Sequence, residues 1–181
     1  SDRALATMSS MRTDTWLRGA GLATWLVCGV PLGAELSAGG VPPERAAWAL
    51  VGFVLFGAAF WINTSERCSH VGRTRRIALL LMQVAGGLAM VGLTGNGLPG
   101  ATLVIIAGQL PMVLSPRAAL AWIGVQSLAL VVILVYTDGR IAAVSGGAAF
   151  AGFQVFAVAT AWLAHSERMA REDLARSNAE L

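Results

Sequence analysis

The stretch Ala118–Tyr136 reads AALAWIGVQSLALVVILVY and contains no charged residue. A helix needs about 20 mostly apolar residues to cross the hydrocarbon core of a bilayer, so this stretch is long enough to span a membrane. A soluble β-strand is shorter, and a half-buried strand alternates apolar and polar residues, which this stretch does not do. We therefore expect a transmembrane helix here.

Five further apolar stretches have a comparable length. They are Trp16–Leu36, Ala46–Asn63, Ile77–Thr94, Leu98–Leu114 and Ile141–Ala164. Turn-forming combinations such as Gly95-Asn96-Gly97 and Asp138-Gly139-Arg140 separate neighbouring stretches. Leu98–Leu114 is the shortest, and its Pro111 lacks a backbone donor and favours a kink. The sequence predicts an all-α polytopic membrane protein with six transmembrane helices.

The composition of the whole chain also indicates that much of its surface contacts lipid. Hydrophobic residues make up 56% of the 181 residues, charged residues only 13%, and the mean hydropathy is +0.66. Soluble domains carry about 25% charged residues, and a chain this short cannot bury so many apolar residues inside itself. The net charge of +3 is small and is no argument for a nucleic-acid partner, so we expect none. The expected partner is the lipid bilayer.

The arginines indicate the orientation of the chain. With the N-terminus inside, eleven arginines fall in cytoplasmic segments, and only Arg45 and Arg140 fall in outer loops. Cytoplasmic loops are enriched in basic residues, and the opposite orientation would invert this bias. We therefore expect residues 1–15 to form a cytoplasmic tail, residues 16–164 a six-helix transmembrane domain, and residues 165–181 a cytoplasmic linker helix. Both ends of the chain lie inside in this prediction.

One glutamine occurs in each of the last four predicted spans. These residues are Gln83, Gln109, Gln126 and Gln154. A buried amide needs partners that the bilayer does not offer. Two interpretations remain open: an interhelical hydrogen-bond cluster in the cytoplasmic half, or independent packing bonds of about 0.6 kcal/mol each. Because Gln109 lies beside Pro111, the expected kink is either a hinge or cavity wall, or a tolerated irregularity of the helix.

Small residues in the last span favour close helix packing. Gly146-Gly147 is followed by Ala148 and Gly152, which are four residues apart and therefore share one helix face. We expect Ala148 and Gly152 to pack within the bundle rather than at a dimer seam.

The chemistry expected of enzymes and ion-coupled transporters is missing from the predicted spans. No Asp, Glu, Lys, Arg or His lies in the central part of any span, which disfavours ion-coupled transport. Cys68 and His70 supply only two potential metal ligands, too few to indicate a metal site. We expect no catalytic residue, no metal and no cofactor in this chain.

The last predicted span continues without Gly or Pro into a charged helix that reaches Leu181. Positions in this helix recur at spacings of four and three, as in a heptad seam. They are Leu163, Glu167, Ala170, Leu174, Ser177 and Leu181. The helix is either the start of a coiled coil or a solvated helical tail.

The segment that ends the chain, Leu174-Ala175-Arg176-Ser177-Asn178-Ala179-Glu180-Leu181, follows directly on this multi-span bundle. In that arrangement the chain resembles the membrane sensor region of bacterial two-component sensor histidine kinases, in the DesK-like, NarL-type branch. The resemblance implies a sensor in the bacterial inner membrane, a homodimer through the exit helix, and a response regulator reached through kinase domains beyond it. Similar segments occur in other signalling linkers, including those of diguanylate cyclases. The chain itself contains no phosphoacceptor motif and no nucleotide-binding domain.

Our leading hypothesis is therefore a signal-input module that passes a membrane stimulus through its last helix. The candidate sensing and transmission residues are Gln83, Gln109, Pro111, Gln126, Gln154, Trp162, Leu174 and Leu181. The alternative function is a small membrane transporter or permease subunit, in which the glutamines and the kink line a pathway.

Overall fold

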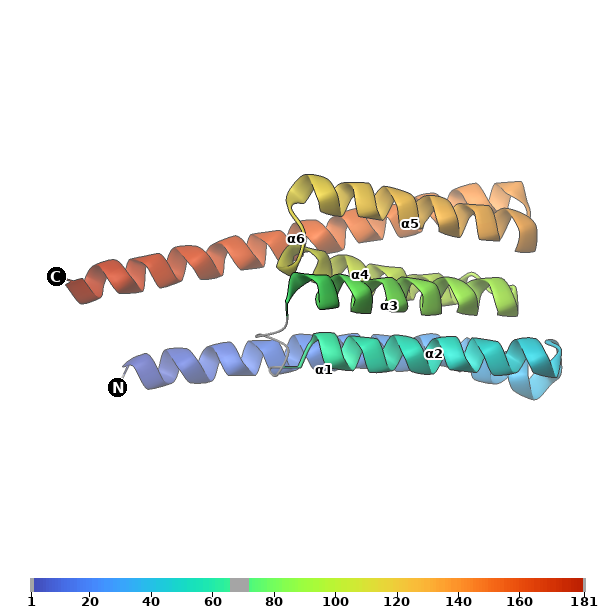
Figure 1. Cartoon of the computed structure of the whole chain (residues 1–181), viewed down its shortest axis with the longest axis horizontal. Helices are drawn as coiled ribbons and strands as arrows, with labels where there is room; N and C mark the ends of the chain where they lie inside the picture. The colour runs from blue at the N-terminus through green and yellow to red at the C-terminus, as the bar shows by residue number, and fades with distance from the viewer. Residues whose placement is uncertain (1, 66–71, 181) are drawn as a thin grey trace. The chain divides into compact units, whose positions relative to one another are not determined.

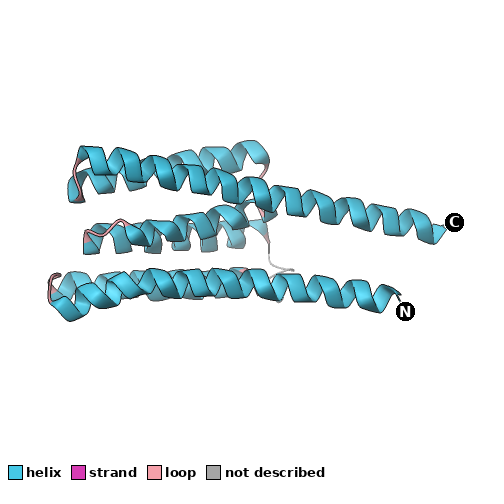
Figure 2. Ribbon diagram, turned by 180° about the vertical axis from the view of Figure 1, so that it is seen from behind, coloured by secondary structure: helices cyan, strands magenta, loops and turns pink. Residues whose placement is uncertain are grey.

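The fold is described by a computed structural model that covers residues 2–65 and 72–180. Every secondary-structure element in these ranges is a helix, and short loops join the helices (Figure 2). The all-α prediction is therefore confirmed for the described residues. The chain divides into two compact units, Ser1–Thr102 (unit 1) and Leu103–Leu181 (unit 2). Cys68, His70 and Leu181 lie outside the described residues.

The described residues of unit 1 form three long helices and one short 3-10 helix (Figure 1). Their bounds are α1 Asp2–Ala38, α2 Pro43–Asn63, α3 Arg73–Thr94 and η2 Leu98–Ala101. The helices α2 and α3 pack along each other, and glycines allow their closest approach. A Cβ atom placed on Gly86 would lie 2.6 Å from the carbonyl oxygen of Gly52. Since this oxygen belongs to a helix backbone, any larger residue at Gly86 would push the two helices apart.

The contact between α1 and α2 pairs aromatic rings with glycines. The ring of Trp25 stacks on Phe53 with 4.4 Å between centroids, and Trp25 Nε1 donates to the Phe53 carbonyl at 3.1 Å. The same indole lies over Gly57, while Phe60 lies over Gly21. Each ring fills space that a side chain would otherwise occupy, so glycine on one helix and an aromatic residue on the other determine how the two fit.

Unit 2 contains a long antiparallel helix hairpin preceded by a short helical segment (Figure 1). The bounds are α4 Thr102–Gln109, η3 Leu110–Met112, α5 Pro116–Thr137 and α6 Arg140–Glu180. Gly139, with a φ of 84°, forms the turn between α5 and α6, and this left-handed conformation favours glycine. Beyond the turn, Val131 occupies the space that a side chain on Gly147 would need, and Leu134 contacts Gly146. The sequence Gly146-Gly147 therefore brings α5 and α6 close together.

The segment predicted as the fourth span, Leu98–Leu114, is not one regular α-helix. It consists of the 3-10 helix η2 of 4 residues, the α-helix α4 of 8 residues and the 3-10 helix η3 of 3 residues. Pro99 and Pro111 lie in the two 3-10 helices, because proline cannot supply the backbone donor that a continuous α-helix requires. The α-helical part of the segment is only about 12 Å long at 1.5 Å per residue.

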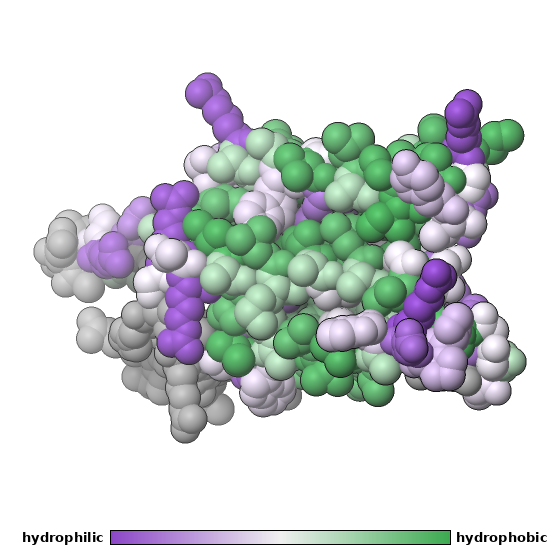
Figure 3. Space-filling view, turned by 45° about the vertical axis from the view of Figure 1, so that its right-hand side comes forward, coloured by the Kyte–Doolittle hydropathy of each residue, from purple (hydrophilic) through white to green (hydrophobic). Residues whose placement is uncertain are grey.

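Four helices among the described residues are long and apolar enough to cross a membrane. They are α2, α3, α5 and residues Arg140–Asn178 of α6. Large apolar side chains such as Trp48, Val125 and Phe156 are exposed on them, and Figure 3 shows apolar side chains along the helices with hydrophilic ones toward the ends. The chain thus has the surface of a membrane protein. Neither α1 nor the segment Leu98–Met112 is among the four, so six crossings and the orientation remain predictions.

Candidate functional site

Two of the four glutamines meet at the centre of the α5–α6 hairpin. Gln126 Nε2 donates a hydrogen bond to Gln154 Oε1, and their side chains are 2% and 0% exposed. Ten residues of α5 precede Gln126 and eleven follow it, so the pair lies about 15 Å from either end of the helix. An interhelical hydrogen bond thus joins two of the four glutamines, while a cluster of glutamines in the cytoplasmic half stays a prediction. The place of this pair is the middle of α5 rather than one half of it.

Three further groups extend this contact into a network. Trp122 Nε1 donates to Gln126 Oε1 at 3.0 Å, and Gln126 Nε2 also approaches the Leu103 carbonyl oxygen at 3.5 Å. On the other side, Gln154 Nε2 donates to Ser127 Oγ at 3.2 Å. We call these five residues the glutamine network. It joins α4, α5 and α6 through buried polar atoms.

The chemistry of the glutamine network is that of neutral hydrogen bonding. Gln126 uses its carbonyl oxygen and both of its amide hydrogens, which leaves it fully partnered. The side chains supply amides, a hydroxyl and an indole, and none of them ionises near neutral pH. In residues 2–65 and 72–180, no group of three His, Cys, Asp or Glu side chains could hold a metal ion. The network is therefore suited to setting the rotation of α6 against α5.

The other two glutamines have different surroundings. Gln109 is buried at the end of α4, and its Nε2 donates to the carbonyl oxygen of Ile105 at 3.3 Å, one turn earlier in the same helix. Gln83 is fully buried at the middle of α3 and belongs to unit 1. The structure therefore brings together Gln126 and Gln154, while Gln83 contributes to the interior of the other unit.

The irregularity predicted at Pro111 takes the form of a change in helix type. The α-helix ends at Gln109, and Pro111 is the middle residue of η3. A mid-segment change from α to 3-10 geometry is typical of hinges and of strained sequences. Whether it acts as a hinge stays a prediction.

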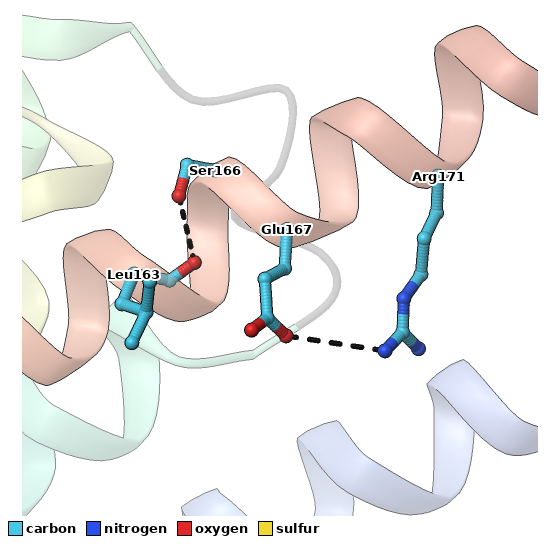
Figure 4. A network of polar contacts seen from close by, with 4 residues as sticks. All are labelled: Leu163, Ser166, Glu167 and Arg171. Atoms are coloured by element: carbon cyan, nitrogen blue, oxygen red, sulfur yellow. Dashed lines mark hydrogen bonds and ion pairs between the residues drawn. The ribbon is translucent and has the colours of Figure 1, made fainter.

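The exit helix continues from the hairpin as predicted. The helix α6 has 41 residues and runs without a break past Trp162, which is half-buried, and Leu174, which is 65% exposed. Figure 4 shows that Ser166 donates to the Leu163 carbonyl oxygen and that Glu167 pairs with Arg171 one turn later. A glutamate placed four residues before an arginine supports an exposed helix. The polar part of α6 is therefore stabilised within itself.

The small residues Ala148 and Gly152 do not face α5 within unit 2. Both are exposed, and together with Ala149, Phe153 and Phe156 they line a shallow apolar groove. Within unit 2 they do not pack against another helix, and their packing in a larger bundle stays a prediction. The reason is rotation: Gly147 faces α5, and each following residue is turned by about 100° around the helix axis.

Sequence patterns alone did not identify Trp122, Ser127 and the Leu103 carbonyl as partners of the glutamines. A signal for Trp122 was present, because residues four apart on a helix lie on the same face, and Trp122 precedes Gln126 by four. Ser127 follows Gln126 directly, but neighbouring helix residues are turned by about 100°, so adjacency alone did not indicate its hydrogen bond with Gln154. Nothing local could indicate the Leu103 carbonyl, which comes from a different helix.

We compared the chain with known protein families, sequences and structures. No protein-family model, curated protein sequence or solved structure matches the chain significantly.

Proposed function

We propose that this chain is the membrane signal-input module of a two-component sensor histidine kinase in the bacterial inner membrane. The observation that best supports this proposal is the continuity of α6 from Arg140 to Glu180. A helix of 41 residues is about 62 Å long, which is twice the roughly 30 Å thickness of the hydrocarbon core. It carries the buried Gln154 in its apolar part and exposed charged residues in the rest. A movement of α6 at Gln154 is thus carried along one rigid helix beyond the bilayer.

The hydrogen bonds that hold Gln154 are weak enough to be exchanged. It accepts from Gln126 and donates to Ser127, and buried interhelical bonds in membrane proteins contribute about 0.6 kcal/mol each. Their sum of about 1.2 kcal/mol is close to twice the thermal energy. A change in bilayer thickness or a ligand that favours a rotated α6 by a few kcal/mol would therefore shift the population between two arrangements.

The proposed output requires a second copy of the chain, and α6 offers a stripe of exposed positions at coiled-coil spacing for it, although the other described residues of 163–177 are exposed as well. Positions at alternating spacings of four and three are all exposed along α6, from the apolar groove into the exit helix. They are Ala149, Phe153, Phe156, Thr160, Leu163, Glu167, Ala170, Leu174 and Ser177. This spacing is that of a coiled-coil seam. In the proposed homodimer, the exit helices of two copies pair along this stripe.

Cysteine crosslinking in vesicles tests this proposal. With Cys28 and Cys68 replaced by serine, Leu174→Cys on the stripe is compared with Met169→Cys, which is exposed but lies off the stripe. We expect Leu174→Cys to form the disulfide-linked dimer at least five times faster, and its rate to differ between short-chain and long-chain phosphatidylcholine vesicles. Equal rates for the two positions, or rates that ignore bilayer thickness, would contradict signal transmission through α6.

The coding sequence that follows Leu181 in the gene tests the kinase part of the proposal. A continued heptad pattern followed by Glu-x-x-His-Asp would support a histidine kinase and its response regulator. A different effector domain would preserve the sensor role and change the output. A stop codon directly after Leu181 would contradict the proposed kinase arrangement.

A small transporter or permease subunit is the second candidate. The observation in its favour is the end of α4 at the buried Gln109 with Pro111 two residues later, because interrupted helices line the binding sites of transporters. Substrate-dependent flux into vesicles that contain the purified chain would support this alternative.

A further inference from the structure

Several arginines gather at the end of unit 1 where α2 ends and α3 begins. The helix α2 ends at Asn63 and α3 begins at Arg73, and the two pack along each other in opposite directions. The helix α1 reaches the same end, because Arg18 contacts Trp61 in the last turn of α2. We call this region the basic end of unit 1. Its members are Arg18, Trp61, Arg73, Arg75 and Arg76.

Arg18 is held in place by α2. Its guanidinium carbon lies 3.9 Å from the centre of the Trp61 ring, and its Nη2 donates to the Trp61 carbonyl oxygen at 3.5 Å. This oxygen is one of the last four carbonyls of α2, which carry partial negative charge and lack a helical donor. The carbonyl bond and the ring occupy one side of the guanidinium. Among the described residues, Nη2 donates the one hydrogen bond of this guanidinium and Nε is buried, so a ligand can approach only through the two terminal nitrogens.

The N-terminus of α3 adds positive charge, and its first turn contains no acidic residue. The cap residue Gly72 has no side chain to bond the first amides. Instead, the first turn contains Arg73 and Arg75, both exposed and without an ion pair in the described part of the chain. Cations at a helix N-terminus are unfavourable because the helix dipole is positive there. An anion bound at this position would stabilise both the helix and the arginines.

The net charge of the flanking sequence also favours an anionic ligand. Residues 1–18 and 63–76 contain seven arginines and three acidic residues, so their net charge is +4, counted as seven minus three. This excess exceeds the +3 of the whole chain.

An apolar surface lies directly beside these charges. The Trp61 side chain is 53% exposed and that of Ile62 is 39% exposed, at the same end of α2. Tryptophan favours the boundary between headgroups and acyl chains. A ligand that matches this surface combines a phosphate for the arginines with hydrocarbon for the aromatic ring.

We infer that the basic end of unit 1 binds the phosphate of an anionic phospholipid headgroup. The Arg18 fork and the first amides of α3 face the phosphate oxygens, with Arg73 and Arg75 contributing charge, and Trp61 lies against the upper acyl chain. Arginine forks suit phosphate because two parallel N–H groups bond two oxygens at once. This site is independent of the proposed sensor function and would serve a transporter equally.

Lipid titration of the purified chain tests this site. The chain in neutral detergent micelles is titrated with phosphatidylglycerol, with phosphatidylcholine and with free glycerol phosphate, and apparent affinities are taken from the shift in melting temperature. Arg73→Gln/Arg75→Gln is the main variant, because both side chains are exposed and their loss leaves the fold intact. Arg45→Gln is the matched control, since Arg45 is exposed in the first turn of α2 at the opposite end of unit 1.

We expect phosphatidylglycerol to bind at least tenfold more tightly than phosphatidylcholine. An arginine near an anionic headgroup contributes about five-fold in affinity, so the double variant should lose roughly 25-fold and Arg45→Gln should lose nothing. Arg18→Gln should lower the phosphatidylglycerol affinity about five-fold. Its melting shift is measured from the lipid-free melting temperature of the same variant, which corrects for any loss of stability.

Three results would overturn the inference. The first is unchanged phosphatidylglycerol affinity in Arg73→Gln/Arg75→Gln, and the second is an equal loss in Arg45→Gln, which would indicate diffuse attraction to the whole chain. The third is an equal melting shift with free glycerol phosphate at the same concentration, which would show a soluble phosphate ligand instead of a lipid.

Discussion

Replacing the two central glutamines singly and together tests the glutamine network most directly. In Gln154→Leu, the hydrogen bonds with Gln126 and Ser127 are lost. At about 0.6 kcal/mol each, this removes about 1.2 kcal/mol. The amide of Gln126 then lacks its acceptor, and a buried donor without a partner lowers the free energy of unfolding by about a further 1–3 kcal/mol. Leucine recovers part of this by apolar packing, so we expect a net loss of about 1–2 kcal/mol in the free energy of unfolding.

The double variant Gln126→Leu/Gln154→Leu should lower the free energy of unfolding by less than the sum of the two single variants. Replacing both partners with apolar groups of similar size removes the unsatisfied amide, so we expect a coupling energy of about 1 kcal/mol. The control pairs Gln154→Leu with Gln83→Leu, which is equally buried but belongs to unit 1. Independent sites add within about 0.3–0.5 kcal/mol, and we expect additivity there.

The assay is reversible unfolding in mixed micelles of neutral and denaturing detergent, followed by helical circular dichroism. The free energies of the wild type, the single variants and the double variants are compared at one detergent composition. If Gln126→Leu and Gln154→Leu were additive, the two amides would contribute to stability independently. The central role that we assign to the glutamine network would then be refuted.

Three further predictions concern helix packing and the exit helix. Gly147→Val should lower the free energy of unfolding by about 1–3 kcal/mol because Val131 fills the required space, and Val131→Ala in the same chain should restore part of the loss, as detergent unfolding would show. Gly86→Ala should destabilise the protein, because Gly86 faces a neighbouring backbone. Gly33→Ala should stabilise it by about 0.5–1 kcal/mol, because Gly33 faces open space. Melting temperatures that fall equally in the two variants would contradict this packing. Ala170→Pro should interrupt the exit helix at a cost of about 3 kcal/mol and abolish dimer crosslinking beyond it, while crosslinking retained at the wild-type rate would show that helix continuity is unnecessary.

The helices could be anticipated from local sequence. Long apolar runs separated by Gly, Pro and Asn combinations predicted α2, α3, α5 and the apolar part of α6 within a few residues of their observed ends. The uninterrupted exit helix was predicted in the same way, because it contains neither Gly nor Pro beyond Gly152. These features depend on backbone propensities and on solvent preference, and both are properties of neighbouring residues.

The fourth span shows where local reasoning was too coarse. The apolar content of Leu98–Leu114 was recognised, but the two prolines divide it into α and 3-10 segments of unequal length. Hydropathy does not distinguish an α-helix from a 3-10 helix. Each proline removes one backbone N–H donor, and this loss interrupts the α-helix and favours a 3-10 helix at that point.

For this protein, the sequence by itself determined the helical class, the apolar surface and the four residues that had to find polar partners. Only the tertiary structure decided that Gln126 meets Gln154, that Gly147 faces α5 and that Ala148 and Gly152 face outward. The physical reason is that hydropathy and turn residues determine where a helix begins and ends. The rotation of each helix about its axis is set by packing against its neighbours, and one residue of rotation, about 100°, changes which side chains meet.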